Sequence, residues 1–128
     1  MQALLDTHTL LWWLSADPAL GNAARKIIAE SSNAIFVSAA SAWEIATKVR
    51  LGKLPTAADL ASDFTGHIER ETFQTLAISA EHAVRAGLLP GAHKDPFDRM
   101  LIAQAQAEDM PILSNDAVFD AYGVRRIW

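Results

Sequence analysis

The stretch ALLDTHTLLW, residues 3–12, places one carboxylate between two apolar runs. The run Ala3–Leu5 stops at Asp6, and the next apolar run starts at Leu10. Burying a bare carboxylate is costly unless hydrogen bonds or an opposite charge compensate it. Asp6 therefore either caps the helix that the pattern predicts over residues 9–15, or it meets a positive charge.

The composition of the whole chain indicates one globular domain over residues 1–128. Apolar residues make up 51% of the chain and charged residues 20%, which is enough for a core and too apolar for disorder. The absence of cysteine excludes disulfides and thiolate metal sites and suits a reducing cytoplasm. No run approaches the roughly 18 apolar residues of a membrane span. The formal net charge of −4 means that a nucleic acid substrate would need local basic residues or a bound cation.

Along the whole chain, short apolar runs alternate with helical segments. Strands are predicted over residues 3–5, 34–38, 73–79, 110–114 and 124–128. Helices are predicted over residues 9–15, 18–30, 42–52, 56–70, 79–87 and 97–109, with a helical turn over 115–123. This alternation predicts an α/β fold with a short, mostly parallel central sheet flanked by helices.

Acidic residues stand at the ends of the predicted strands or at the starts of neighbouring helices. Asp6 ends the first strand, Glu44 lies in the first turns of the helix after the second, and Asp116 follows the fourth strand by two residues. Asp98 lies near the start of the helix that leads into that fourth strand. Ligands of an open α/β sheet bind beyond the carboxyl ends of its strands, so these four acids are expected at one edge.

Four ionised carboxylates at one edge need compensation. Two like charges about 4 Å apart repel by about 4 kcal/mol at an effective dielectric constant of about 20. Either the acids share protons or a divalent cation neutralises them, and oxygen-only ligands select Mg²⁺ or Mn²⁺. Such an ion can also bridge the protein to a substrate phosphate. Thr7 and Ser114 place supporting hydroxyls beside Asp6 and Asp116.

Each of these acids also has an ordinary structural interpretation. Glu44 and Lys48 are spaced as a surface i,i+4 ion pair, Asp98 suits the first turn of a helix, and Asp116 suits a turn. Only the four acids taken together indicate a functional site. Basic residues that could form a phosphate-binding rim are Lys48, Arg50, Lys53 and Arg99.

Two histidines are interpreted as surface or hydrogen-bonded structural residues. His8 and His93 belong to no HExxH or other spacing of metal ligands. We therefore expect neither to ligate the ion.

Four segments together resemble the PIN-domain ribonucleases, in particular the VapC toxins of type II toxin–antitoxin pairs. They are LLDTHTLLWWL (4–14), VSAASAWEIATKVRLGKL (37–54), DPFDRMLIAQA (95–105) and ILSNDAVF (112–119). The resemblance implies a three-layer PIN-like fold and an Mg²⁺ or Mn²⁺ site. It also implies cleavage of RNA by a metal-activated water, neutralisation by a VapB-type antitoxin, and a homodimer. The residues that match the acids of the PIN motif are Asp6, Glu44, Asp98 and Asp116.

The fourth acidic position departs from the pattern of many relatives. Many relatives carry a further Asp between this acid and the Phe, whereas this chain has NDAVF. Asn115 could therefore act together with Asp116 at this position. Asp95 competes with Asp98, but Asp95 suits a helix cap and Asp98 begins the apolar stripe of that helix. The number of ions, one or two, stays open.

Three alternative functions are weighed against the nuclease. A haloacid-dehalogenase-type phosphatase needs a second acid two residues after Asp6, and that position holds His8. A response-regulator receiver needs an acceptor Asp at the end of the third strand, and residues 73–79 offer none. A degenerate PIN-like module that only binds RNA or protein would not need all four acids, and only an activity measurement decides against it.

Overall fold

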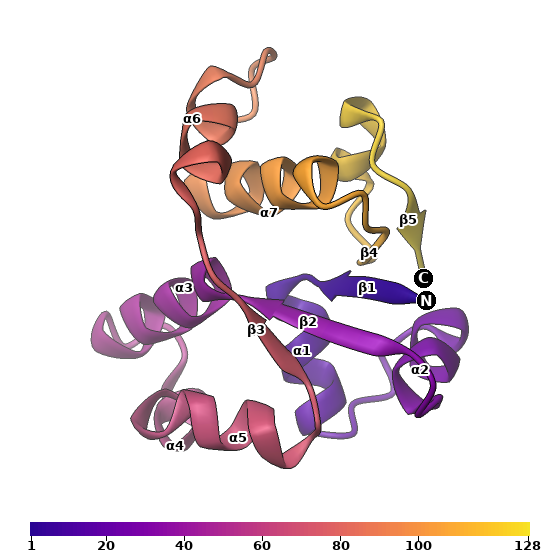
Figure 1. Cartoon of the computed structure of the whole chain (residues 1–128). Helices are drawn as coiled ribbons and strands as arrows, with labels where there is room; N and C mark the ends of the chain where they lie inside the picture. The colour runs from indigo at the N-terminus through magenta and orange to yellow at the C-terminus, as the bar shows by residue number, and fades with distance from the viewer.

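The computed structural model describes all 128 residues and shows a five-stranded parallel sheet between layers of helices (Figure 1). The strand order is β3-β2-β1-β4-β5, and every neighbouring pair is parallel. The three-layer α/β prediction is therefore confirmed. The strands are β1 (Gln2–Leu5), β2 (Ala34–Ser38), β3 (Gln74–Leu76), β4 (Ile112–Leu113) and β5 (Arg126–Ile127).

Helices cover both faces of this sheet. In Figure 1, α6 and α7 lie above the sheet, and α1, α2, α4 and α5 lie below it. No helix combines the length and the apolar character needed to cross a membrane. The helices are α1 (Thr7–Leu14), α2 (Asn22–Ala29), α3 (Ala39–Arg50), α4 (Ala58–Ser62), α5 (Phe64–Arg70), α6 (Ala80–Leu88) and α7 (Pro96–Ala107), with 3₁₀ turns η1 (Pro55–Ala57) and η2 (Ala117–Tyr122).

The apolar strands supply two cores, one on each face of the sheet. Successive side chains of a strand point to opposite faces, so Leu4 packs with the α7 side and Leu5 with the α1 side. Both leucines are completely buried. The core on the α7 side includes Phe119, and the core on the α1 side includes Ile45. This two-sided burial explains why the strands are apolar throughout rather than alternating.

The chain order reverses next to the central strand, and this reversal positions the site. The first three strands extend outward from β1 on one side, and the chain then returns to place β4 and β5 on the other side. The reversal point is therefore the gap between the carboxyl ends of β1 and β4. Asp6 directly follows β1, and Ser114 directly follows β4.

Two predicted helices differ from the structure because side chains close local turns. The helix predicted from Pro18 begins only at Asn22, since the Asp17 carboxylate accepts a hydrogen bond from the Ala19 N–H and closes a turn. The helix predicted over residues 56–70 is broken into η1, α4 and α5. The break lies at Asp63, whose side chain caps α5. Local capping therefore overrode helix propensity at both places.

The first helix and the third strand also differ from their predicted boundaries. The first helix begins at Thr7 rather than at residue 9, because Asp6 already acts as its cap. The strand predicted over residues 73–79 shortens to β3, which pairs with β2 only and is therefore an edge strand.

Candidate metal centre

Asp6 caps α1, as one of its two interpretations predicted, and it lies at the reversal point of the sheet. Its Oδ1 accepts a hydrogen bond from the Thr9 N–H at 2.9 Å, and its Oδ2 accepts one from the Ser114 hydroxyl. Asp6 is 6% exposed and forms no ion pair with a basic side chain. Hydrogen-bond donors and the positive end of the α1 dipole therefore compensate its charge.

Ser114 joins the ends of β1 and β4. Its completely buried hydroxyl donates to Asp6 and accepts a hydrogen bond from the Asp116 N–H at 3.0 Å. Asp116 caps η2, where its Oδ1 accepts from the Val118 N–H at 3.0 Å. Asp116 and the neighbouring Asn115 are both exposed. The fourth acid thus lies at the same edge as Asp6, in a more open position.

Glu44 projects from α3, which starts directly after β2. Ser38 ends that strand and caps the helix through the Ala40 N–H at 2.9 Å, which fixes the first turns of α3. Glu44 is only 6% exposed. Its Oε1 accepts a hydrogen bond from the Thr7 hydroxyl at 2.7 Å, and its Oε2 lies 2.7 Å from Lys48 Nζ. The i,i+4 pair is present as the spacing suggested, but its acid is buried rather than at the surface.

Asp98 lies in the first turn of α7. Asp95 caps this helix through the Phe97 N–H at 2.9 Å, as predicted. The carboxylate of Asp98 lies 2.9 Å from Nε2 of His93, which donates to it. Burial raises the pKa of Asp98 above its ordinary value; the hydrogen bond from His93 opposes this rise, and the charges of Asp95 and Asp116 add to it.

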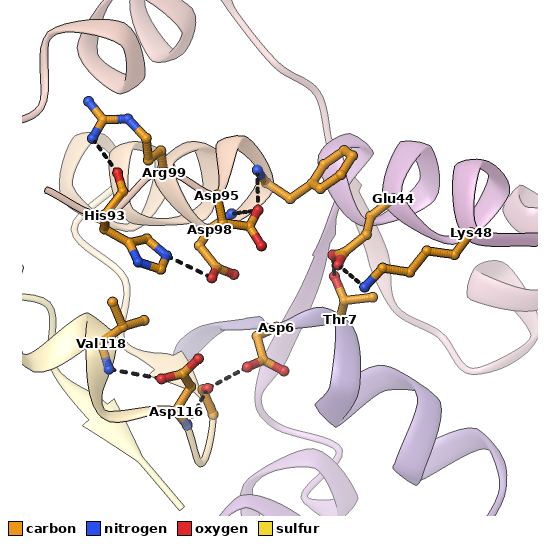
Figure 2. A network of polar contacts seen from close by, with 12 residues as sticks. Asp6, Thr7, Glu44, Lys48, His93, Asp95, Asp98, Arg99, Asp116 and Val118 are labelled. Atoms are coloured by element: carbon orange, nitrogen blue, oxygen red, sulfur yellow. Dashed lines mark hydrogen bonds and ion pairs between the residues drawn. The ribbon is translucent and has the colours of Figure 1, made fainter. Parts of the chain in front are cut away.

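The four carboxylates come from distant parts of the chain and face one opening (Figure 2). Ser114 links Asp6 to the backbone of Asp116, and the charge of Asp116 acts on Asp98. In the present arrangement no three acidic or histidine side chains lie close enough to share one ion. Lys48 and His93 instead hold Glu44 and Asp98 by separate contacts.

A buried glutamine fixes the spacing of the two helices that carry Glu44 and Asp98. Gln104 of α7 is completely buried, and its Oε1 accepts a hydrogen bond from the Ser38 hydroxyl at 2.5 Å. Its Nε2 donates to the Ala77 carbonyl at 3.3 Å. The start of α3 is therefore tied directly to the middle of α7. The sequence pattern did not single out this residue, because a glutamine on a helix is ordinarily a surface residue.

The donor set of this opening fits a hard divalent cation. The side chains in hydrogen-bond contact with the four carboxylates include the hydroxyls of Thr7, Thr9 and Ser114 and the imidazole of His93, and the chain has no cysteine. Carboxylate and hydroxyl oxygens are the ligands that Mg²⁺ and Mn²⁺ prefer. Burial raises the pKa of Asp98, so its ionised form is less favourable here than in water.

A family model described as "PIN domain" matches residues 3–124. The chain belongs to the PIN domain family. Ribonuclease VapC16 of Mycobacterium tuberculosis is 43% identical over 70 residues, which cover 55% of this chain and 47% of that relative. The matched segment thus spans about half of the curated relative's length.

Solved structures with the same fold include toxin–antitoxin proteins. VapBC2 of Rickettsia felis, bound to a promoter DNA fragment, gives a TM-score of 0.71 at 18% identity and covers 99% of this chain and 98% of that one. VapC20 of M. tuberculosis, a Sarcin-Ricin loop cleaving toxin, gives 0.70 at 16% identity and covers 95% of both chains. A toxin–antitoxin complex from Klebsiella pneumoniae gives 0.60 at 19% identity and covers 98% and 96%. At these identities the likeness concerns the fold alone.

The basic residues predicted for a phosphate-binding rim lie in different surroundings in this PIN domain. Arg99 directs its guanidinium to backbone carbonyls at the end of α6 and in the following loop. A phosphate would have to compete with these carbonyls for it. Lys48 is at the opening but paired with Glu44. Arg50 and Lys53 are exposed at the far end of α3, about two helical turns beyond Glu44.

Asp98→Asn is expected to raise the free energy of unfolding of this PIN domain at neutral pH without metal. Because the folded-state pKa of Asp98 exceeds the ordinary value of 3.8, ionisation is less favourable in the folded chain than in the unfolded one. The wild type therefore loses stability as the pH rises through that folded-state pKa, and the amide does not titrate. Urea denaturation in EDTA, from about pH 4 to about pH 7, measures the difference.

The difference in the free energy of unfolding between Asp98→Asn and the wild type should become smaller toward the acidic end of this range. Asp59→Asn, at a side chain that is 92% exposed, serves as the control and should show no comparable gain. A gain at Asp98→Asn that grew as the pH fell would contradict the assigned direction of the shift.

Proposed function

We propose that this PIN domain is an Mg²⁺- or Mn²⁺-dependent endoribonuclease and the toxin of a VapBC-type pair. One observation carries the proposal: four acids from separate elements face one opening at the reversal point of a PIN fold. The match to the PIN family and the 43% identity to Ribonuclease VapC16 support the nuclease class. The choice of ion follows from a site whose acidic ligands are all carboxylates and which contains no cysteine.

Asp6, Glu44 and Asp98 would hold the ion, and Asp116, the most exposed of the four acids, would complete the site. When bound, the ion supplies an activated water and stabilises negative charge on the scissile phosphate. A cation held by Oε2 of Glu44 would compete with the ammonium of Lys48 for that oxygen. Lys48 lies one helical turn from Glu44, where its charge would also attract the RNA backbone.

The hydroxyls around the acids orient their carboxylates. Thr7 donates to Glu44, and Ser114 donates to Asp6. Both residues are buried. Donors of the protein therefore hold the carboxylates of Asp6 and Glu44 in one orientation, which favours a defined geometry for a cation. Arg50 and Lys53 are the remaining candidates for contacts with neighbouring phosphates.

We infer that the partners are an RNA substrate, a VapB-type antitoxin and a second copy of the chain. The solved proteins with this fold include VapBC2 and a toxin–antitoxin complex, which supports the antitoxin. The exposed apolar side chains of α6, Val84 at 61% and Leu88 at 79%, leave a helix face available to a partner chain. The homodimer itself follows only from the resemblance to VapC toxins.

A non-catalytic PIN-like binding module is the second candidate. It is favoured by one observation: Lys48 and His93 already engage two of the acids, so the protein can compensate part of the charge without metal. A phosphatase of the haloacid-dehalogenase type has no support, because the position of its general acid is the exposed His8.

Removal of metal is expected to stop RNA cleavage completely. Purified protein, freed of antitoxin, is incubated with total cellular RNA in Mg²⁺, in Mn²⁺ and in EDTA, and cut ends are mapped. We expect cleavage in either ion, none in EDTA, and recovery when excess Mg²⁺ is returned. Cutting that persists in EDTA would contradict a metal-dependent site, and the absence of cleavage of any RNA would favour the binding module.

A further inference from the structure

Arg99 uses its guanidinium to hold backbone carbonyls rather than any acid. Its Nε donates to the Ala86 carbonyl at 3.1 Å, its Nη1 to the His93 carbonyl at 3.0 Å, and its Nη2 to the Leu89 carbonyl at 2.7 Å. A longer contact of 3.4 Å joins Nη2 to the Gly87 carbonyl. Carbonyls at a helix C-terminus carry partial negative charge, so the α6 end and the loop beyond it neutralise this side chain.

The loop that Arg99 holds has no other backbone support. Between Leu89 and Lys94 the chain forms no backbone–backbone hydrogen bond. Most of its residues are exposed, with His93 half-buried. The loop is held by the guanidinium of Arg99, by the contact that His93 makes, and by packing of Leu89 on the core of the α7 side and of Gly91 beside Tyr122.

His93 is the point where the loop reaches the metal centre (Figure 2). Its Nε2 lies 2.9 Å from Oδ2 of Asp98, and no other protein group forms a hydrogen bond with that carboxylate. Arg99, the next residue after Asp98, fixes the backbone of His93 through its carbonyl. Asp98 thus faces the site, and Arg99 holds the backbone of His93, whose side chain contacts the Asp98 carboxylate.

We propose that Arg99 and His93 are positioning residues, which fix the Asp98 carboxylate for metal binding through the loop after α6. This inference rests on the proposed function of the site. Ligating carboxylates are ordinarily oriented by a hydrogen-bonded neighbour, and loss of such a neighbour lowers metal affinity by about 10- to 100-fold. Arginine is required because its planar fork reaches several carbonyls at once, whereas lysine presents one point charge.

The test measures Mn²⁺ binding to the full chain, by electron paramagnetic resonance of free Mn²⁺ in a titration. The variants are Arg99→Met, Arg99→Lys, His93→Ala and His93→Gln, with Arg85→Met as the matched control on the outer surface of α6. Circular dichroism checks that each variant is folded. His93→Ala leaves the Arg99 contacts to Ala86 and Leu89 in place, so it remains informative if the Arg99 variants unfold.

We expect His93→Ala and Arg99→Met to weaken Mn²⁺ binding about 10- to 100-fold, and Arg85→Met to leave it unchanged. Arg99→Lys should resemble Arg99→Met, and His93→Gln should restore part of the affinity because it keeps an N–H donor. If His93→Ala bound Mn²⁺ like the wild type, the inference would fail, although the proposed function would stand.

Two further outcomes distinguish failure of the positioning role from failure of the proposed metal site. Unchanged Mn²⁺ affinity with a raised KM for RNA in Arg99→Met would show a phosphate contact instead and overturn the positioning role. Absence of Mn²⁺ binding by the wild type itself would overturn both the inference and the proposed metal site.

Discussion

Asp6→Asn is expected to lower the rate of RNA cleavage more than about 100-fold, with little change in stability. Loss of an outer-shell partner alone costs about 10- to 100-fold, and Asp6 is proposed to contact the ion itself. Asparagine caps helices about as well as aspartate, so its side-chain oxygen can still accept from the Thr9 N–H. The substitution therefore removes the charge and keeps the fold.

The matched control for this prediction is Asp17→Asn. Asp17 also accepts a backbone hydrogen bond, from the Ala19 N–H at 2.8 Å, but it closes a turn after α1 and takes no part in the site. Single-turnover cleavage of one mapped RNA at saturating Mg²⁺ compares both variants with the wild type. Similar rates for the wild type and Asp6→Asn would remove Asp6 from the catalytic centre.

Gln104→Ala is expected to lower the free energy of unfolding by about 3 kcal/mol. The change leaves a cavity in a completely buried position, and it removes the partner of the Ser38 hydroxyl and of the Ala77 carbonyl. Large-to-small changes in a core cost about 2–5 kcal/mol, and each buried polar group left unpaired costs about 1–3 kcal/mol. Urea denaturation monitored by tryptophan fluorescence gives the difference.

A second variant and a control separate the two causes. Gln104→Met keeps the volume and loses the hydrogen bonds, so it should cost about 1–3 kcal/mol. Gln106→Ala, on the same helix, removes one partly buried hydrogen bond to the Tyr122 carbonyl and should cost about 1 kcal/mol. If Gln104→Ala and Gln106→Ala lowered the free energy of unfolding equally, the buried contact between α3 and α7 would stabilise the fold no more than a partly buried hydrogen bond.

The sequence was sufficient for the features that depend on local pattern and on strand order. Apolar runs that end at Asp6 and shortly before Asp116 indicated parallel strands whose carboxyl ends carry acids. The observed order β3-β2-β1-β4-β5 places both at the reversal point of the sheet. The cap role of Asp95 could also be predicted, because a cap depends only on residues within one turn.

The contacts that sequence alone missed depend on how separate segments of the chain pack against one another. Whether Arg99 binds a phosphate or a carbonyl depends on where the loop after α6 lies, and no local pattern determines that position. The burial of Gln104 likewise depends on the packing of α7 against Ser38, 66 residues away. His93 offered one local signal, a histidine five residues before a site acid, but that spacing fixes no contact by itself.

The central claim is that four acids gather at this edge because a hard divalent cation binds among them. An anomalous difference map from crystals grown with Mn²⁺ tests it most directly. We predict a peak in the opening, within direct or water-bridged reach of Asp6, Glu44 and Asp98, with Lys48 displaced from its present contact with Glu44. A map with no peak there, at Mn²⁺ concentrations that saturate cleavage, would contradict the account.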